Sequence, residues 1–130
     1  MQALFQDRLI GVVRKGHPLG RREITPSRYA SGKHVAVSRR GLERGPIDEA
    51  LKPLGLERRI VTIVGGFSAA LALARASDLI ASVPERHTGN LRAGMVSFPL
   101  PVATPTLTIS MLIFGLGAAA LLRATHEEFA

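Results

Sequence analysis

The chain has 130 residues, no cysteine and a hydrophobic content of 46%, which suits one folding unit or a piece of one. The absence of cysteine excludes disulfides and thiolate metal sites and fits the cytoplasm. The net charge is +7, and residues 1–59 hold 13 of the 17 Lys and Arg but 6 of the 10 acids; these cations occur in scattered pairs without a helix-turn-helix or zinc-finger pattern, which favours a solvated basic surface over nucleic-acid binding.

The first third of the chain predicts strand, helix and strand. The apolar run "LIGVV" predicts a buried strand over Leu9–Val13, which ends in a turn at Gly16-His17-Pro18. Thr25 and Pro26 have the form of an N-cap and a first helical residue, so we expect a short helix over Pro26–Ala30. The alternating "HVAVS" predicts a second strand over His34–Ser38.

A second helix is expected to start at Gly45-Pro46. Pro53 and Gly55 limit it to about two turns, and acidic residues in its first turn suit the helix dipole. Its apolar residues recur at the spacing of one helical face: Ile47, Ala50, Leu51 and Leu54.

The middle of the chain predicts a βα unit and a further strand. The β-branched run Ile60–Val64 is followed by two glycines, and Ser68 is expected to cap the helix "SAALALARA". This helix is apolar on most faces and should lie buried between layers. "SDLIASVPE" then returns as a short apolar strand, which a parallel sheet covered on both faces requires. We therefore expect Ile60–Val64 and Leu79–Val83 side by side and parallel, with the helix as their crossover.

The last third of the chain is less regular. Met95–Leu100 contains Pro99 and predicts an edge or crossing strand, and Leu107–Phe114 predicts the last strand. Residues 118–124 have high helix propensity without an amphipathic face. A membrane span over residues 107–122 is disfavoured by Pro105 and by internal glycines, and the first ten residues lack the pattern of a secretory signal.

Residues 65–70 carry two candidate motifs. Gly66-Phe67-Ser68-Ala69-Ala70 has the strand-to-helix context of a nucleophile elbow, with Asp78 and His87 in hydrolase order, but Ala70 stands where the elbow requires glycine and the chain is short for that fold. Gly65-Gly66 either offers backbone N–H groups to an anion or simply makes a tight turn. The four histidines have no metal-like spacing. We expect no catalytic residue, metal or cofactor.

The order of these elements resembles the effector-binding domain of LysR-type transcriptional regulators. "LFQDRLIGVVRKGHPL" is similar to the strand and the V.r.gHPL turn midway through that domain. "ITPSRYASGKHVAVSRRG" is similar to the helix and strand that follow, and "GPIDEALKPLGL" to the next helix. "IVTIVGGFSAALALARASDLIASVPERHT" is similar to the family's strand, helix and strand ending in Val-Pro. The resemblance covers residues 4–112.

The resemblance implies an α/β, periplasmic-binding-protein-like (type II) fold with two subdomains around a ligand cleft. This chain would be a partial effector-binding domain, mainly the second α/β subdomain (residues 20–95) plus crossing strands, with residues 1–14 and 101–130 as remnants of the first subdomain. The ligand would be a small metabolite, often an anion. The intact protein would be a cytoplasmic homo-oligomer that binds DNA only through an N-terminal domain missing here, with no membrane partner.

The resemblance also implies which residues face the cleft. These are Ser38 and Arg39 after the second strand, and Gly65, Gly66, Phe67 and Ser68 after the third. Ser38 and Ser68 would donate hydrogen bonds and Arg39 would pair with a carboxylate. The tail after residue 112 departs from the family pattern, and a truncated or frame-shifted reading would explain this. The alternatives are a solute-binding protein of a transporter and a small serine hydrolase using Ser68.

Overall fold

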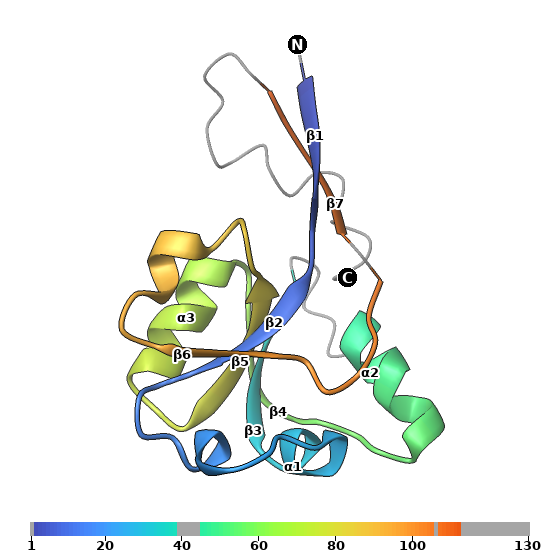
Figure 1. The fold of residues 1–130 in the computed structure, drawn as a ribbon, viewed down its shortest axis with the longest axis vertical. Coiled ribbons are helices and arrows are strands. Elements are labelled where there is room, and N and C mark those ends of the chain that lie inside the picture. The colour runs from blue at the N-terminus through green and yellow to red at the C-terminus, as the bar shows by residue number, and fades with distance from the viewer. Residues whose placement is uncertain (1, 39–44, 106, 113–130) are drawn as a thin grey trace.

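Two separate β-sheets share the chain (Figure 1). The computed structural model describes residues 2–38, 45–105 and 107–112, with side chains over residues 6–38 and 45–105. The strands are β1 Gln2–Asp7, β2 Leu9–Val13, β3 Lys33–Val37, β4 Arg59–Val64, β5 Leu79–Pro84, β6 Val96–Pro99 and β7 Leu107–Leu112. The helices are α1 Pro26–Ala30, α2 Pro46–Leu51 and α3 Phe67–Arg75, with 3-10 turns η1 Pro18–Arg21, η2 Lys52–Leu54 and η3 Gly89–Arg92.

The larger sheet has five strands in the order β4-β3-β5-β2-β6. β3 is parallel to both β4 and β5, whereas β2 is antiparallel to β5 and β6. The expectation that β4 and β5 are neighbours is therefore wrong, although they point the same way and α3 connects them. The crossover passes over β3, whose residues His34, Val35 and Ala36 are buried, while β4 is left as a half-exposed edge strand.

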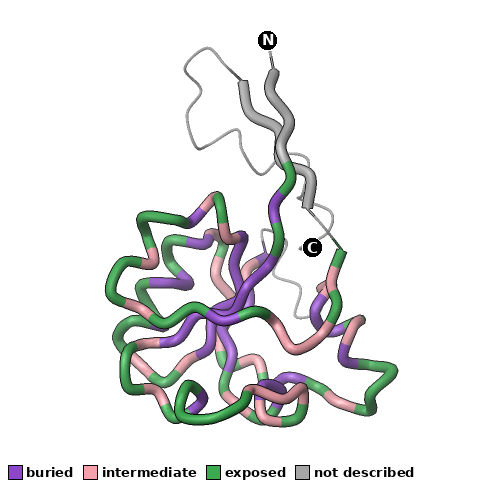
Figure 2. Tube along the Cα trace, in the orientation of Figure 1, coloured by how far each residue is buried: buried purple, intermediate pink, exposed green. Residues whose placement is uncertain are grey.

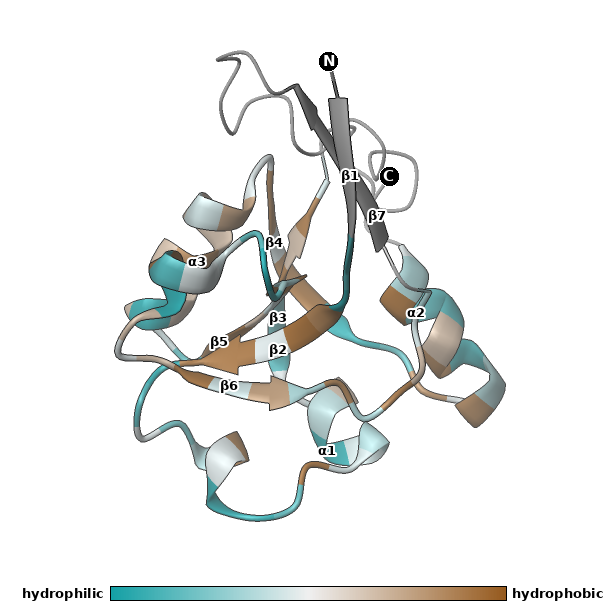
Figure 3. Ribbon diagram, turned by 45° about the horizontal axis from the view of Figure 1, so that its top comes forward, coloured by the Kyte–Doolittle hydropathy of each residue, from teal (hydrophilic) through white to brown (hydrophobic). Residues whose placement is uncertain are grey.

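Helices cover both faces of this sheet, and its central strands are the most deeply buried part of the described residues (Figure 2). On one face α3 packs on Ile10, Val12, Val35 and Val83. On the other face α1 and α2 pack on the opposite side chains of β2 and β5 together with Phe98. The apolar residues of β2 and β5 thus lie between two layers of helices (Figure 3).

Helix α3 buries one side only, which corrects the expectation that it lies between layers. Its buried residues are Phe67, Ala70, Leu71 and Ala74, at the spacing of a single helical face. Leu73 is 39% exposed on the opposite side. In α2 the expected stripe holds for Ile47 and Leu51, but Leu54 is 54% exposed because the α-helical period ends where η2 begins.

Several local predictions are confirmed at the level of single hydrogen bonds. Thr25 Oγ1 accepts a bond from the N–H of Arg28 at 3.1 Å, and Pro26 is the first residue of α1. In the Gly16-His17-Pro18 turn, Nδ1 of His17 accepts from the N–H of Leu19 at 2.9 Å. The proton of that ring is therefore on Nε2, which donates to the carbonyl of Asp78 at 2.8 Å and ties η1 to the start of β5.

The smaller sheet is made of β1 and β7. β1 and β7 pair antiparallel from Gln2 opposite Leu112 to Asp7 opposite Leu107, and they project away from the larger sheet (Figure 1). Only Arg8 separates β1 from β2. β6 is confirmed as an edge strand, with Pro99 opposite Ile10. The expected structure of residues 113–130 lies outside the described residues, and no helix in the described part is long and apolar enough to span a membrane.

Candidate functional site

The carboxyl ends of the parallel strands β3, β4 and β5 meet at one end of the larger sheet. Ser38 follows β3, Gly65 and Gly66 follow β4, and residues 85–88 form the turn after β5. The N–H of Ser38 donates to the carbonyl of Val64 at 2.9 Å, so the first two of these segments are in direct contact. Ligands of open α/β sheets bind at such an end, because the loops there converge while the strands hold them in place.

Ser38 and Arg39 are placed differently by the structure. Ser38 is only 4% exposed, so it is buried where β3 ends. Arg39 lies outside the described residues. The proposed pairing of Arg39 with a ligand carboxylate therefore remains a prediction from the sequence.

The turn between β4 and α3 leaves open space beside its backbone. A Cβ atom added at Gly65 or at Gly66 would meet no atom of the described residues within 4 Å. The backbone of Gly66 is extended, with φ −155° and ψ 161°, so its conformation does not demand glycine. Because both side chains are absent, a ligand can approach the backbone N–H groups that precede α3 closely.

Ser68 does not cap α3. Gly66 is the N-cap residue, and Ser68 is an exposed residue in the first turn of the helix. The helix starts earlier than expected because Phe67 is part of its buried face, with 4% of its surface exposed. The Ser68 hydroxyl is thus not used by the helix end, and this leaves it accessible at the candidate site.

Phe67 faces inward against the turn after β5. Its ring meets the ring of His87 edge to face, with centroids 6.0 Å apart and planes at 74°. Half-burial lowers the pKa of His87, and the nearby Asp7 carboxylate opposes this shift. His87 therefore packs against the residue that follows the glycine turn, as an aromatic neighbour of Phe67 and not as the base of a triad.

The serine hydrolase alternative fails on the positions of its acid and base. Asp78 precedes β5, where it accepts bonds from the Arg14 guanidinium at 2.6 and 2.9 Å, and His87 follows the other end of that strand. A six-residue strand is roughly 20 Å long, so Asp78 cannot orient the ring of His87. Ser68, Asp78 and His87 do not form a triad.

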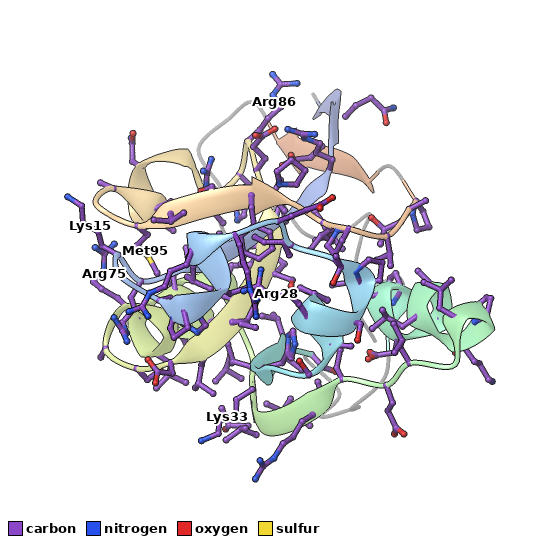
Figure 4. The ribbon with its side chains drawn as sticks, turned by 60° about the horizontal axis from the view of Figure 1, so that its bottom comes forward. Lys15, Arg28, Lys33, Arg75, Arg86 and Met95 are labelled. Atoms are coloured by element: carbon purple, nitrogen blue, oxygen red, sulfur yellow. The ribbon has the colours of Figure 1, made fainter. Side chains whose placement is uncertain are left out.

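A hollow of about 340 Å³ opens beside these loops, where the chain passes from one sheet to the other. It is lined by Gln6, Asp7, Arg8, Glu85 and Arg86. Its size falls within the range of small-ligand sites, at its lower end. Arg86 lies at the end of the sheet opposite to Lys33, as the two labelled side chains in Figure 4 show.

The hollow joins residues nearly 80 positions apart. Arg8 and Glu85 form a two-bond ion pair, with Nε to Oε1 at 2.9 Å and Nη2 to Oε2 at 3.2 Å. A guanidinium of Arg86 donates to the carbonyl of Gln6 at 3.2 Å. Sequence reasoning missed all five lining residues, although the charged "PERH" after an apolar strand marks the end at which a ligand would bind. Among the described residues, no group of three or more His, Asp and Glu side chains is arranged to hold a metal ion.

Comparisons with known proteins point to one family. The family model described as the LysR substrate binding domain matches residues 1–114. The transcriptional activator NahR of Pseudomonas putida is 32% identical over 110 residues, which cover 83% of this chain and 37% of the activator. A crystal structure of a probable transcriptional regulator from Pseudomonas aeruginosa is 27% identical, with a TM-score of 0.67, and covers 81% of this chain and 37% of that one.

A more distant solved structure shows the fold alone. The effector-binding domain of QuiR in complex with shikimate has a TM-score of 0.64 at 15% identity, covering 92% of this chain and 61% of that one. The chain spans 37% of the length of the curated activator that it matches. These likenesses confirm the expected α/β, periplasmic-binding-protein-like (type II) fold.

Proposed function

Because the chain belongs to the LysR substrate-binding domain family, we propose that it is a ligand-sensing part of a transcription regulator. In this proposal a small metabolite, often an anion, binds at the end of the larger sheet where β3, β4 and β5 have their carboxyl ends, next to the junction with β1. The observation that carries the proposal is the Gly65-Gly66 turn, beside whose Cα atoms the described residues leave open space, at the same end of the sheet as residues 85–86 of the hollow.

The proposed ligand contacts follow from this placement. The amides at Gly65 and Gly66 and the hydroxyl of Ser68 would donate to the ligand, with Ser38 below them and Phe67 as the apolar wall. Arg39 would pair with a carboxylate. None of these groups provides a nucleophile with a base, which supports a sensor rather than an enzyme.

The proposed division of the domain rests on the two sheets. Residues 20–95 would form most of one subdomain, to which β2 also pairs, and the parts of residues 1–14 and 101–130 that form β1 and β7 would belong to another, because these two strands pair only with each other. Ligand binding would then change how the two sheets are oriented, and the differential affinity for the two orientations would be the signal. The intact regulator would be a cytoplasmic homo-oligomer that contacts DNA through a separate domain.

A titration of the isotope-labelled chain tests the ligand site. Acetate, benzoate and shikimate would serve as carboxylate probes, followed through the backbone amide resonances. We expect saturable shifts at Gly65, Gly66 and Ser68 with at least one probe, and about tenfold weaker binding in Ser68→Ala. Ser27→Ala is the matched control, because Ser27 is an exposed serine in the first turn of α1. Absence of saturable shifts at these amides with all three probes would refute the site.

The DNA upstream of the coding region separates the two binding-protein functions. An in-frame winged helix-turn-helix would support the regulator. A secretory signal there would instead make the chain part of a solute-binding protein of a transporter, which has the same fold.

A further inference from the structure

Asp7 belongs to one sheet by its backbone and to the other by its side chain. It is the last residue of β1, where it lies opposite Leu107 of β7. The residue is 4% exposed, and its carboxylate reaches the turn after β5 in the larger sheet. Oδ1 accepts from the N–H of Arg8 at 2.8 Å and of Arg86 at 2.9 Å, and Oδ2 accepts from the N–H of His87 at 3.0 Å.

The turn over residues 85–88 is held to this junction by most of its amides. The N–H of Glu85 donates to the carbonyl of Arg8 at 2.9 Å. Three of the four N–H groups in the turn therefore donate hydrogen bonds to Asp7 or Arg8. Hydrogen bonds to a buried carboxylate are among the stronger ones in proteins. A displacement of β1 at Asp7 would therefore displace the turn as well.

The carbonyl side of the same turn is fixed from within the larger sheet. Thr88, which is fully buried, donates its hydroxyl to the carbonyl of Pro84 at 2.6 Å. Arg92 donates to the carbonyl of Glu85 at 2.8 Å and to the hydroxyl of Thr88 at 3.1 Å. The turn is thus a small rigid unit, which moves as a whole instead of absorbing a displacement locally.

This unit ends at the candidate ligand site. His87, whose amide is bonded to Asp7, places its ring against Phe67 at 6.0 Å. Phe67 is the first residue of α3 and directly follows the Gly65-Gly66 turn. A continuous series of contacts therefore leads from β1 through Asp7, His87 and Phe67 to the glycine turn where a ligand would bind.

We propose that Asp7 is a positioning residue that couples the orientation of the β1–β7 sheet to the conformation of the ligand loop over residues 65–68. The inference rests on the proposed function for its biological meaning. The coupling itself is a property of the chain without ligand. The coupling is reciprocal, so a change at Phe67 must also alter the environment of Asp7 at the end of β1.

Nuclear magnetic resonance on the Asp7→Asn variant of the 130-residue chain tests the coupling without any ligand. Asparagine offers a single acceptor oxygen, so we expect amide exchange of Arg86 or His87 to become about tenfold faster or more. We also expect the amide resonances of Gly65, Gly66 and Ser68 to shift. Arg8→Gln is the control, because it removes the exposed ion pair with Glu85 and leaves the carboxylate of Asp7 in place.

The titration of His87 distinguishes positioning from a simple charge effect. If Asp7 positions the ring, the ring leaves Phe67 in Asp7→Asn, burial is lost, and the pKa of His87 rises toward its ordinary value. If Asp7 only contributes its charge, the pKa falls further, which would overturn the proposal. Faster exchange confined to residues 85–88, with residues 65–68 unchanged, would also overturn it while leaving the ligand site itself intact.

A variant at the other end of the series covers the case in which Asp7→Asn does not fold. Phe67→Leu keeps an apolar side chain at the start of α3 and removes the ring contact with His87. We expect faster exchange at His87 and shifted amide resonances at Gln6 and Asp7. Unchanged resonances at Gln6 and Asp7 would overturn the coupling.

Discussion

Asp48 and Arg58 form a two-bond ion pair inside the protein, with Nε to Oδ1 and Nη2 to Oδ2 both at 2.8 Å and 6% of each side chain exposed. Asp48 also accepts from the N–H of Gly45 at 2.9 Å, which fixes the start of α2. The pair holds α2 to the segment that leads into β4. Because both charges are buried, the ion pair compensates each of them for the loss of hydration by water.

We predict that Asp48→Ala lowers the free energy of unfolding by about 3 to 5 kcal/mol, because it leaves the Arg58 guanidinium buried without its counter-ion. Urea denaturation followed by circular dichroism measures this change. Glu85→Gln, which breaks the exposed pair with Arg8, serves as the control and should barely move the midpoint.

The double variant Asp48→Leu/Arg58→Met is expected to recover part of the loss, because it removes both buried charges together. Equal destabilisation by Asp48→Ala and Glu85→Gln would show that burial does not make the Asp48–Arg58 pair special.

A second prediction concerns His34, a fully buried residue of β3. Its Nε2 donates to the carbonyl of Tyr29 at 2.7 Å, and its Nδ1 has no hydrogen-bond partner among the described residues. Burial, with help from the Arg58 charge, lowers the pKa of His34 to about 4. The unfolded chain, in which the pKa is about 6.5, therefore takes up a proton first as the pH falls.

Stability that His34 contributes is fully present above pH 6.5 and is lost progressively down to pH 4. The loss attributable to this residue is about 3 kcal/mol. Urea titrations of the native chain and of His34→Gln at pH 7 and pH 4.5 measure it, since glutamine donates a hydrogen bond but does not titrate. We expect a clearly smaller decline in His34→Gln, and an identical decline in both chains would contradict the assignment.

A third prediction concerns the close contact of Gly11 with Phe98. Gly11 lies on β2 opposite Phe98 of the edge strand β6, and a Cβ atom at Gly11 would come within 3.0 Å of the ring. We predict that Gly11→Ala destabilises the chain by about 1 to 3 kcal/mol, because the ring must move out of its packed position. Thermal unfolding monitored by circular dichroism measures the change.

Gly20→Ala is the control for this prediction, since a Cβ atom there meets no described atom within 4 Å. Combining Gly11→Ala with Phe98→Leu should cost less than the sum of the two single changes, because the shorter side chain makes room for the methyl group. Additive costs would mean that the ring of Phe98 is not what excludes a side chain at Gly11.

Short-range signals explain which parts of the fold the sequence predicts correctly. Thr25-Pro26 specifies the start of α1 through one hydrogen bond three residues away, and "LIGVV" specifies β2 through its own side chains. Ser68 was a wrong prediction of the same kind. It has the chemistry of a cap, but the burial of Phe67 moves the helix start to Gly66. A cap preference of about 1 kcal/mol is smaller than the gain from burying an aromatic ring.

Long-range contacts explain what the sequence does not predict. The insertion of β3 between β4 and β5 depends on which strands pair, and a crossover helix fits either arrangement. Asp7 appears in the sequence as one acid among ten, and its role arises from bonds to Arg86 and His87, about 80 residues away. The glycine turn was visible as a motif, whereas the hollow was not, because two segments far apart in the sequence form it.

The last prediction uses the open space at the Gly65-Gly66 turn to test the ligand site without disturbing the fold. Neither glycine has a neighbour among the described residues within 4 Å of an added Cβ atom, so Gly65→Ala and Gly66→Ala should unfold at the same urea concentration as the native chain. If a ligand approaches these amides, however, the new methyl group occupies its place. We expect about tenfold weaker binding of whichever carboxylate probe binds best, a loss of about 1.4 kcal/mol. Gly20→Ala, equally unhindered but near the opposite end of the sheet, should bind that probe normally, and equal affinity in all three variants would place the ligand elsewhere.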